Sequence, residues 1–307
     1  MRIIIDTDAG IDDAVALMLA LRYPGAQVEA VTTVCGNCSL EKVNRNVFTV
    51  LDAMGSDAPV YAGAAQPLVA AWSAEPVHGE DGLGDYHERP PTTRRLEAEH
   101  AALALIRLAD AYPGELTLVA LAPLTNIALA TRLDPAFPSK IKAFVFMGGT
   151  IRAQGNTDNI AAEWNIYCDP EAAHIVLESF AQARMVSWET TLDCPLPIAA
   201  YRELAALPTP SARFFERINR IFVDHDSPGE YGDDYLLADA LAMAVALEPS
   251  LITARLTRHV AVELHGTHTR GQTVIDHMRK LGKPANVEIV TAVDMARMEE
   301  MLREMLR

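Results

Sequence analysis

The sequence has no long apolar run and few cysteines, and each shortage excludes a class of protein. No window of 18 apolar residues occurs among the 307 residues, so we expect no membrane span and no membrane partner. The four cysteines, Cys35, Cys38, Cys168 and Cys194, are too few and too scattered for a small secreted disulfide scaffold. The chain begins with a strand pattern and has no basic and then apolar leader, so we expect no signal peptide and a cytoplasmic protein.

Positive charge is also scarce. The chain has 26 Lys and Arg against 41 Asp and Glu, a formal net charge of −15. Binding to nucleic acid or to an anionic membrane requires many cations that displace counterions over an extended surface. We therefore expect no nucleic-acid partner and a small-molecule substrate of low net charge.

The chain is long and apolar enough, at 307 residues and 50% hydrophobic content, to bury a large core. No repeat or linker divides it, so we predict one domain over residues 1–307. Strand patterns alternate with helical patterns, which predicts an α/β fold with a Rossmann-like open, mainly parallel sheet flanked by helices. We expect strands at 3–5, 28–34, 59–61, 116–121, 143–147 and 184–188. We expect helices at 14–21, 40–54, 97–111, 124–133, 170–180, 199–223 and 236–247. Extra β structure near the C-terminus is predicted at 260–264, 272–275 and 287–293, followed by a helix from Met295.

Four carboxylates crowd into the first strand-to-helix turn. Asp6 and Asp8 follow the β-branched run 3–5, and Asp12 and Asp13 fall in the first turn of the helix. Two like charges 4 Å apart repel by about 4 kcal/mol at an effective dielectric near 20, whereas a helix N-terminus returns only about 0.3–1 kcal/mol per carboxylate. Either some of these acids are protonated or a cation lies among them. For a cation, all-oxygen donors favour calcium or magnesium over zinc. The alternative is that two acids cap the helix and two lie solvated in a loop.

A C-x-x-C motif, Cys35-Gly36-Asn37-Cys38, lies between a predicted strand and a predicted helix, as a redox dithiol does. The chain is far larger than a thioredoxin unit, and a redox role leaves the acidic turn unexplained. A disulfide oxidoreductase stays as an alternative hypothesis. Structural zinc is disfavoured, because no second C-x-x-C or His pair lies at ligand spacing.

Two irregular regions are long enough to line a site. Residues 63–93 form the longest predicted loop, and such loops inside a compact domain usually line or cover a site. Residues 148–165 run from Gly148-Gly149 through an Asn-rich stretch to Glu163-Trp164-Asn165. Neutral amides with one acid suit hydroxyl groups better than phosphates.

At this point the motifs resemble those of the nucleoside hydrolase family, the inosine–uridine-preferring type and its relatives. The segment 6–14, Asp-Thr-Asp-Ala-Gly-Ile-Asp-Asp-Ala, is similar to the family signature. Further matching segments follow in family order over nearly the whole chain: 32–37, 77–79, 123–128, 147–149, 163–166, 169–173, Asp239 and 269–274. The resemblance implies hydrolysis of ribonucleosides to free base and ribose.

The resemblance also implies one Ca²⁺ deep in the site. By match, its ligands are the carboxylates of Asp8, Asp13 and Asp239 and the backbone carbonyl of Thr125. Asp8 and Asp239 are the candidate catalytic residues, with Asp8 as general base on a metal-bound water. A pocket rich in carboxylates suits the positive charge that develops on the sugar as the bond breaks.

The same match assigns residues to the substrate. Asp12 and Asn37 are expected to hold ribose hydroxyls, and Met147 to pack against the sugar. Asn156, Glu163 and Asn165 are expected on the 5′ side, with Asn159 as a substitute for Asn156 because the spacing differs by one residue.

Two positions depart from the family pattern. Ala9 replaces the usual Pro, from which we expect only a less rigid turn. Ala238 replaces a histidine that helps to protonate the leaving base in the inosine–uridine branch. Replacement candidates near the base are His78, His225, Tyr231 and Tyr235, and Trp164 is a candidate for stacking on the base. The preference for purine or pyrimidine bases stays open.

Rival hypotheses come from other classes. In a haloacid-dehalogenase-like phosphatase, Asp6 would be the nucleophile and Asp8 the acid/base, with magnesium, but we find no matching phosphate-binding Lys or acidic pair. A non-catalytic nucleoside or ribose binder predicts calcium-dependent binding without turnover. By family analogy we expect a homo-oligomer, a tetramer or a dimer.

Overall fold

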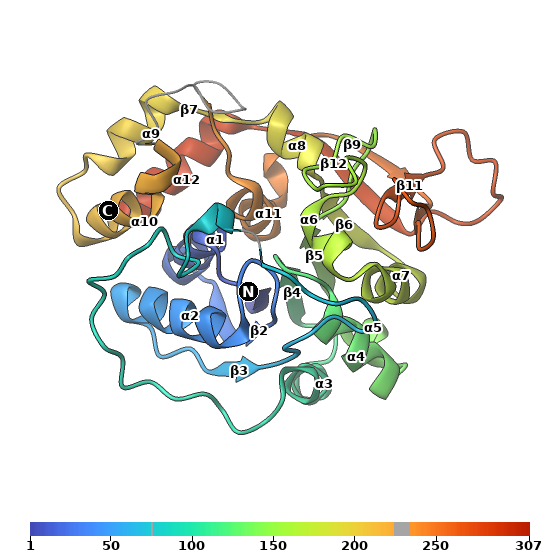
Figure 1. Ribbon diagram of the computed structural model, residues 1–307, viewed down its shortest axis with the longest axis horizontal. Helices are drawn as coiled ribbons and strands as arrows, with labels where there is room; N and C mark the ends of the chain where they lie inside the picture. Colours follow the sequence, from blue (N-terminus) through green and yellow to red (C-terminus); the bar gives the residue numbers. More distant parts are fainter. Residues whose placement is uncertain (75, 224–233) are drawn as a thin grey trace.

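The computed structural model describes residues 1–74, 76–223 and 234–307, and its centre is an eight-stranded sheet (Figure 1). The strand order is β3-β2-β1-β4-β5-β6-β12-β9, and neighbours are parallel except for the antiparallel β12–β9 pair. The strands are β1 Arg2–Thr7, β2 Gln27–Thr33, β3 Val60–Ala62, β4 Leu116–Ala120, β5 Ala143–Met147, β6 Ala183–Val186, β9 Ile252–Arg258 and β12 Val287–Val293. This confirms the predicted α/β class and the mainly parallel sheet.

Helices cover both faces of the sheet (Figure 1). They are α1 Ile11–Arg22, α2 Leu40–Met54, α3 Ala101–Ala111, α4 Thr125–Leu133, α5 Phe137–Lys140, α6 Trp164–Cys168, α7 Pro170–Ser179, α8 Trp188–Asp193, α9 Ile198–Ala205, α10 Pro210–Val223, α11 Ala238–Leu247 and α12 Met295–Leu306. Short 3₁₀ turns lie at Pro76–His78 and Pro249–Leu251. None of the helices in the described ranges is long and apolar enough to cross a membrane.

The side chains of β1 alternate between the two faces of the sheet, so this strand contributes to two hydrophobic cores. Ile3 and Ile5 pack in the core formed with α1, α2, α11 and α12, whereas Ile4 packs in the core formed with α3, α4 and α7. Successive side chains of a strand point to opposite faces, so a strand buried on both faces needs an uninterrupted apolar run. The run at residues 3–5 provides it.

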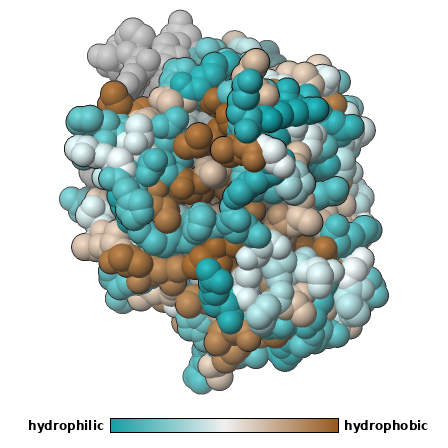
Figure 2. Space-filling model, turned by 90° about the vertical axis from the view of Figure 1, so that its right-hand side faces the viewer, coloured by the Kyte–Doolittle hydropathy of each residue, from teal (hydrophilic) through white to brown (hydrophobic). Residues whose placement is uncertain are grey.

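Two small antiparallel pairs supplement the sheet. β10 (Val260–Val262) pairs with β11 (Thr273–Ile275), and β7 (Leu196–Pro197) pairs with β8 (Asp234–Tyr235). Of the β structure predicted near the C-terminus, 260–264 and 272–275 correspond to the β10–β11 pair, whereas 287–293 is β12 and lies in the central sheet between β6 and β9. Figure 2 shows the side of the molecule at the right of Figure 1, where hydrophilic and apolar side chains are mixed.

Some predicted boundaries were wrong for local reasons. The helix predicted from 97 begins at Ala101, because Glu97 instead donates its N–H to the Val60 carbonyl (2.9 Å) and His100 caps the helix. The predicted strand 184–188 ends at Val186, since Ser187 caps α8. The predicted helix 199–223 is two helices, broken at residues 206–209 before Pro210 starts α10. Strand β9 and helices α6 and α8 were not predicted.

The strand order places the chemistry. From β1 the chain proceeds outward to β2 and β3, then returns to β4 on the other side of β1. Open α/β sheets bind ligands at such a reversal, beyond the carboxyl ends of the strands. Asp8 follows β1 and Thr125 begins α4 just after β4, so the acidic turn lies at the switch point.

Candidate active site

The turn after β1 is held by its own polar groups. The Thr7 hydroxyl donates to Asp13 Oδ1, and the Gly10 N–H donates to Asp13 Oδ2 (2.8 Å). A Cβ on Gly10 would lie 2.6 Å from Asn37 Nδ2, so the close approach of these segments requires glycine. Ala9 has φ 38°, in the left-handed region. Proline is fixed near φ −65°, so Ala9 adopts a backbone that proline cannot.

A cluster of three carboxylates lies beside this turn. One oxygen each of Asp12, Asp13 and Asp239 lies within 4.8 Å of the others, and this cluster joins the turn to the first turn of α11. Asp8 is adjacent, because the Asn37 side-chain amide lies 3.2 Å from both Asp8 Oδ1 and Asp13 Oδ2. The structure thus brings together four acids that the sequence separates by up to 231 positions.

Burial makes this arrangement costly without a cation. Desolvation raises the pKa values of Asp8 and Asp239 well above their ordinary range, and the neighbouring carboxylates raise them further. Burial and then the charge of Asp12 raise the pKa of Asp13 to about 6. A divalent cation, if bound here, would offset the repulsion and keep these groups ionised.

The donor set fits a hard cation. Asp12 Oδ1 is buried and has no hydrogen-bond partner among the described residues. His78 Nδ1 is 3.8 Å from this oxygen but accepts the Ile11 N–H (3.2 Å), so it does not donate to Asp12. The carboxylates of the cluster offer oxygen only, which suits Ca²⁺ or Mg²⁺.

Thr125, the predicted carbonyl ligand, is buried at the start of α4. Its hydroxyl donates to Asp169 Oδ2 (2.7 Å), and Asp169 also accepts the N–H of Leu68 (2.9 Å). These bonds fasten the long loop after β3 and the start of α7 to the start of α4. The acidic turn lies at the same edge of the sheet, after β1.

A cavity of about 880 Å³ extends from the acidic cluster. Ten of the predicted site residues line it: Asp12, Asn37, His78, Met147, Asn156, Glu163, Trp164, Asn165, Tyr235 and Asp239. Asp8, Asp13 and Thr125 are buried and do not line the cavity. Tyr231 and His225 lie outside the described residues.

Glu163 organises the far wall of the cavity. Its carboxylate accepts the N–H groups of Asn165 (2.8 Å), Gly149 (2.9 Å) and Ile166 (3.2 Å). Burial outweighs these bonds and raises the pKa of Glu163 to about 7. The Asn165 amide donates to the carbonyls of Leu121 (3.0 Å) and Met147 (3.3 Å), which fixes it at two strand ends.

The two asparagine candidates are distinguished by their contacts. Asn156 lines the cavity and accepts the Trp164 N–H (2.9 Å). Asn159 is not among the lining residues; its oxygen accepts the Ala162 N–H (3.0 Å) and its amide donates to the Arg270 carbonyl. Asn156 is therefore the better placed of the two.

Sequence reasoning missed part of the lining. Trp188 of α8, Ile198 of α9 and Arg217, Ile221 and Phe222 of α10 line the cavity. The helical spacing of Ile221 and Phe222, like that of Phe214, Phe215 and Ile218, favours core packing over a role in a binding site. The last three are core residues, whereas Phe222 is 38% exposed and its ring meets the edge of His78 at 5.8 Å between centroids.

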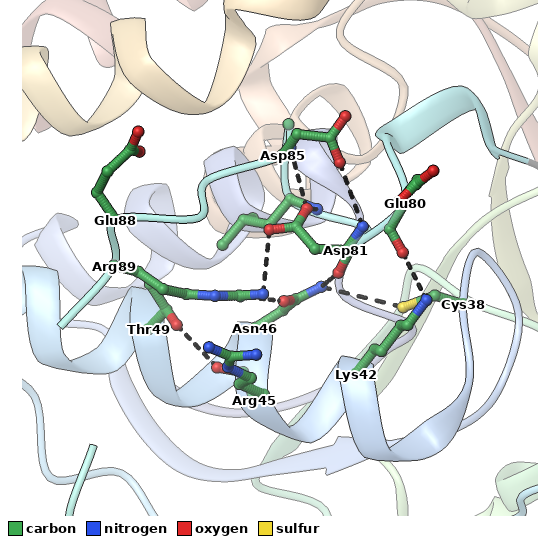
Figure 3. A network of polar contacts seen from close by, with 12 residues as sticks. Cys38, Lys42, Arg45, Asn46, Thr49, Glu80, Asp81, Asp85, Glu88 and Arg89 are labelled. Carbon is green, nitrogen blue, oxygen red and sulfur yellow. Dashed lines mark hydrogen bonds and ion pairs between the residues drawn. The ribbon is translucent and has the colours of Figure 1, made fainter. Parts of the chain in front are cut away.

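A polar network anchors the loop that follows His78 (Figure 3). Arg89 donates to Asn46 Oδ1 (2.6 Å) and to Asp81 Oδ2 (3.0 Å), and its side chain is 3% exposed. Asn46 in turn donates to the carbonyls of Ala9 (3.0 Å) and Asp81 (3.1 Å). The buried guanidinium therefore connects the loop and α2, and through Asn46 the acidic turn.

The C-x-x-C cysteines are not activated thiols. Both are buried and free, and burial followed by the charge of Asp8 raises the pKa of each to about 12. A redox dithiol requires a lowered pKa and access to its substrate. The oxidoreductase hypothesis has no support in this geometry.

Fold and site together define a class of protein: an α/β protein with a cluster of largely buried carboxylates that contributes to the wall of a cavity. Comparison with known proteins gives the family. The family model described as inosine-uridine preferring nucleoside hydrolase matches residues 3–300. This chain therefore belongs to the nucleoside hydrolase family, as its motifs predicted.

Individual relatives agree over nearly the full length. An inosine-uridine preferring nucleoside hydrolase of Leishmania major is 35% identical, covering 95% of this chain and 93% of the relative. The non-specific ribonucleoside hydrolase RihC of Salmonella typhimurium is 37% identical, with 96% and 94% covered. Among solved structures, an inosine-guanosine nucleoside hydrolase has a TM-score of 0.92 at 35% identity, covering 99% of this chain and 98% of that one. A purine-preferring ribonucleoside hydrolase from Gardnerella vaginalis has a TM-score of 0.91 at 28% identity, covering 100% and 98%.

Proposed function

We propose that the protein hydrolyses the N-glycosidic bond of ribonucleosides and releases free base and ribose. The observation that carries the proposal is the continuity of the acidic cluster with a cavity lined by amides, aromatic rings and apolar side chains. Relatives named for ribonucleosides share the whole fold, which supports the substrate class.

We propose Ca²⁺ as the cation, held by Asp8, Asp13, Asp239 and the Thr125 carbonyl. The oxygens of Asp13 and Asp239, which lie within 4.8 Å of each other in a buried cluster of carboxylates, support a cation at this position. Asp12 Oδ1 has no hydrogen-bond partner among the described residues and so can accept a ribose hydroxyl. When bound, the ion offsets the carboxylate charges and acidifies nearby water.

The chain's own residues then perform the reaction. Asp8 accepts the proton of the attacking water, and its carboxylate is oriented by the Asn37 N–H (2.7 Å) and side-chain amide. Negative charge on Asp8 and Asp12 stabilises the cationic sugar that forms as the bond breaks. Asp12 and Asn37 bind the ribose diol, Met147 packs on the ring, and Asn156, Glu163 and Asn165 bind the 5′ side.

The leaving base requires a hydrogen-bond donor, because Ala238 supplies none. The Tyr235 hydroxyl already donates to Asn219 Oδ1. His78 accepts the Ile11 N–H at Nδ1, so in the neutral ring Nε2 carries the proton on the side chain that lines the cavity. We therefore propose His78 as the donor and Trp164 as the surface on which the base stacks.

The phosphatase alternative has a geometric obstacle. Asp6, its nucleophile, is 0% exposed, and its Oδ1 accepts bonds from Thr32 and Asn126 (2.8 Å). No phosphoryl group reaches a carboxylate enclosed in this way. We further propose, from the resemblance, a single-domain protein that acts as a cytoplasmic homo-oligomer, a dimer or a tetramer.

Product analysis separates the remaining alternatives. Inosine, adenosine, guanosine, uridine and cytidine are incubated with the calcium-loaded protein, and free base and ribose are quantified by chromatography. Equimolar base and ribose from at least one nucleoside is the expected result. Calcium-dependent binding of a nucleoside without any product would show a binder instead of an enzyme.

A further inference from the structure

A second pocket, separate from the acidic cavity, lies where β9 ends and β10 begins. It has a volume of about 300 Å³, and its lining includes Arg258, His259, Asp276, Arg279 and Lys283. We call it the basic pocket. Figure 1 places β9 and β11 on the opposite side of the molecule from α2 and α10. None of its residues lines the acidic cavity.

The pocket concentrates positive charge on an acidic protein. Three cations, Arg258, Arg279 and Lys283, face a single lining carboxylate, whereas the whole chain carries −15. Within the described part of the chain, neither arginine forms an ion pair, and Lys283 reaches only the exposed Glu178 at 3.4 Å. Charges of one sign that gather in a concave site attract a small counter-ion.

Asp276, the one carboxylate in the lining, forms hydrogen bonds with backbone N–H groups of its own loop. Asp276 Oδ1 accepts the Lys280 N–H (2.8 Å), and Oδ2 accepts the Leu281 N–H (2.8 Å). Its two backbone bonds close the turn that carries Arg279, which has φ 55°. Asp276 therefore shapes the basic pocket, and Arg258 and Arg279 have no carboxylate partner among the described residues.

His259 adds a specific requirement to this charge. The side chain is 8% exposed, and Nδ1 lies 3.1 Å from the Pro284 carbonyl. A carbonyl only accepts, so Nδ1 carries the proton and Nε2 of the neutral ring carries a lone pair. Nε2 is buried and has no partner among the described residues, and Arg258 Nε is in the same position. Buried polar atoms are normally paired, so both atoms point to a missing partner.

We infer that the basic pocket binds a small anion that also carries a hydroxyl proton, namely inorganic phosphate, which keeps at least one P–OH group near neutral pH. Its anionic oxygens meet Arg258, Arg279 and Lys283, and its P–OH donates to His259 Nε2. Sulfate has a similar size and shape but carries no proton near neutral pH, so it leaves Nε2 unsatisfied. This inference does not depend on the proposed reaction.

The test is calorimetric titration of the full chain at pH 7 and constant ionic strength. Inorganic phosphate is titrated first, and sulfate and glycerol phosphate are titrated in parallel. We expect one phosphate per chain and binding about tenfold weaker for sulfate, because one hydrogen bond to a charged ligand is lost. Glycerol phosphate, an ester whose phosphate group has mostly lost its P–OH proton at pH 7, should also bind more weakly than inorganic phosphate, and equal binding would overturn the requirement for a proton.

Matched variants locate the site. Arg279 and Lys280 are adjacent exposed cations, but only Arg279 lines the basic pocket. Arg279→Gln should weaken phosphate binding about fivefold or more, whereas Lys280→Gln should change it less than twofold. Equal losses in both variants, equal binding of sulfate and phosphate, or no phosphate binding would each overturn the inference.

Discussion

The Asp8 carboxylate accepts two hydrogen bonds from Asn37, one from its backbone N–H at 2.7 Å and one from its side-chain amide at 3.2 Å. Both bonds favour the charged form of an acid whose pKa burial otherwise raises. Asn37 thereby links the C-x-x-C segment to the proposed general base. The motif that resembles a redox dithiol instead supplies an amide to the acidic turn.

Replacing Asn37 should alter the ionisation of Asp8. Asn37→Ala removes the side-chain donor and so raises the pKa of Asp8, which moves the acid limb of the pH profile of kcat/KM to higher pH. We expect a loss of at least about tenfold at pH 7, of the order of one hydrogen bond to a charged group. Asn159→Ala is the control, since Asn159 does not line the cavity, and an unshifted acid limb in Asn37→Ala would contradict this role.

Substrate and calcium binding should distinguish the role of Asp12 from that of Asp13. If Asp12 holds ribose hydroxyls, Asp12→Asn should raise KM about tenfold or more and leave calcium affinity within about threefold. Asp13→Asn should weaken calcium about a hundredfold, because it removes a ligand carboxylate. Calorimetric titration of calcium distinguishes the two. A calcium affinity that falls equally in both variants would make Asp12 a ligand.

Metal-free protein should lose stability as the pH rises. Glu163 has a pKa of about 7 when folded and 4.5 in its ordinary state. Between these values the folded chain binds one proton more than the unfolded chain, so stability falls with rising pH and levels off above about 7. The full effect is at most about 3 kcal/mol.

Urea unfolding at pH 5 and pH 7.5 in chelator measures this dependence, and Glu163→Gln is the matched variant. The difference between the two pH values should be smaller in Glu163→Gln than in the wild type. Asp13, whose folded pKa is about 6, adds a loss of the same sign that calcium should reverse. A wild-type stability that rises over this interval in chelator would contradict the assignment.

The network around Arg89 should matter for both stability and substrate binding. Arg89→Met leaves Asn46 Oδ1 and Asp81 Oδ2 without their partner, and we expect a loss of about 3 kcal/mol in the free energy of unfolding. KM should rise as well, because the loop carries His78. Arg94→Met is the control. Arg94 pairs with the exposed Asp52 of α2, the helix that also carries Asn46, so this variant should lose less than about 1 kcal/mol in the free energy of unfolding. Equal losses in the two variants would show that burial of Arg89 contributes nothing.

Local pattern was sufficient for much of this molecule. The run 3–5, the turn with four acids and helix 40–54 all follow from residues close in sequence, and each lies where it was expected. The position of Asp239 is a different matter. A single acid at the start of a helix usually interacts only with the helix dipole. Only the resemblance to a family predicted that Asp239 lies in the same site as Asp13.

Other parts depend on tertiary contacts that no pattern displays. Ile221 and Phe222 continue the apolar stripe of α10, and their spacing favours core packing. Ile221 does pack against the core and also lines the cavity, whereas Phe222 lines the cavity and is 38% exposed. Edge strand β9 is largely exposed, so it lacks the apolar run that marks the central strands. The positive φ of Ala9 was not predicted, because alanine rarely adopts it. The hydrogen bond that the Ala9 carbonyl accepts comes from Asn46, which is distant in sequence.

The central claim is that ribose release depends on calcium and on the carboxylate of Asp8, which acts as the general base. The most direct measurement is the rate of ribose release from the best nucleoside of the panel, in calcium, in excess chelator, and in Asp8→Asn. We predict release that stops in chelator, returns with added calcium, and falls at least about a thousandfold in Asp8→Asn. Release that persists unchanged in chelator or in Asp8→Asn would contradict the account.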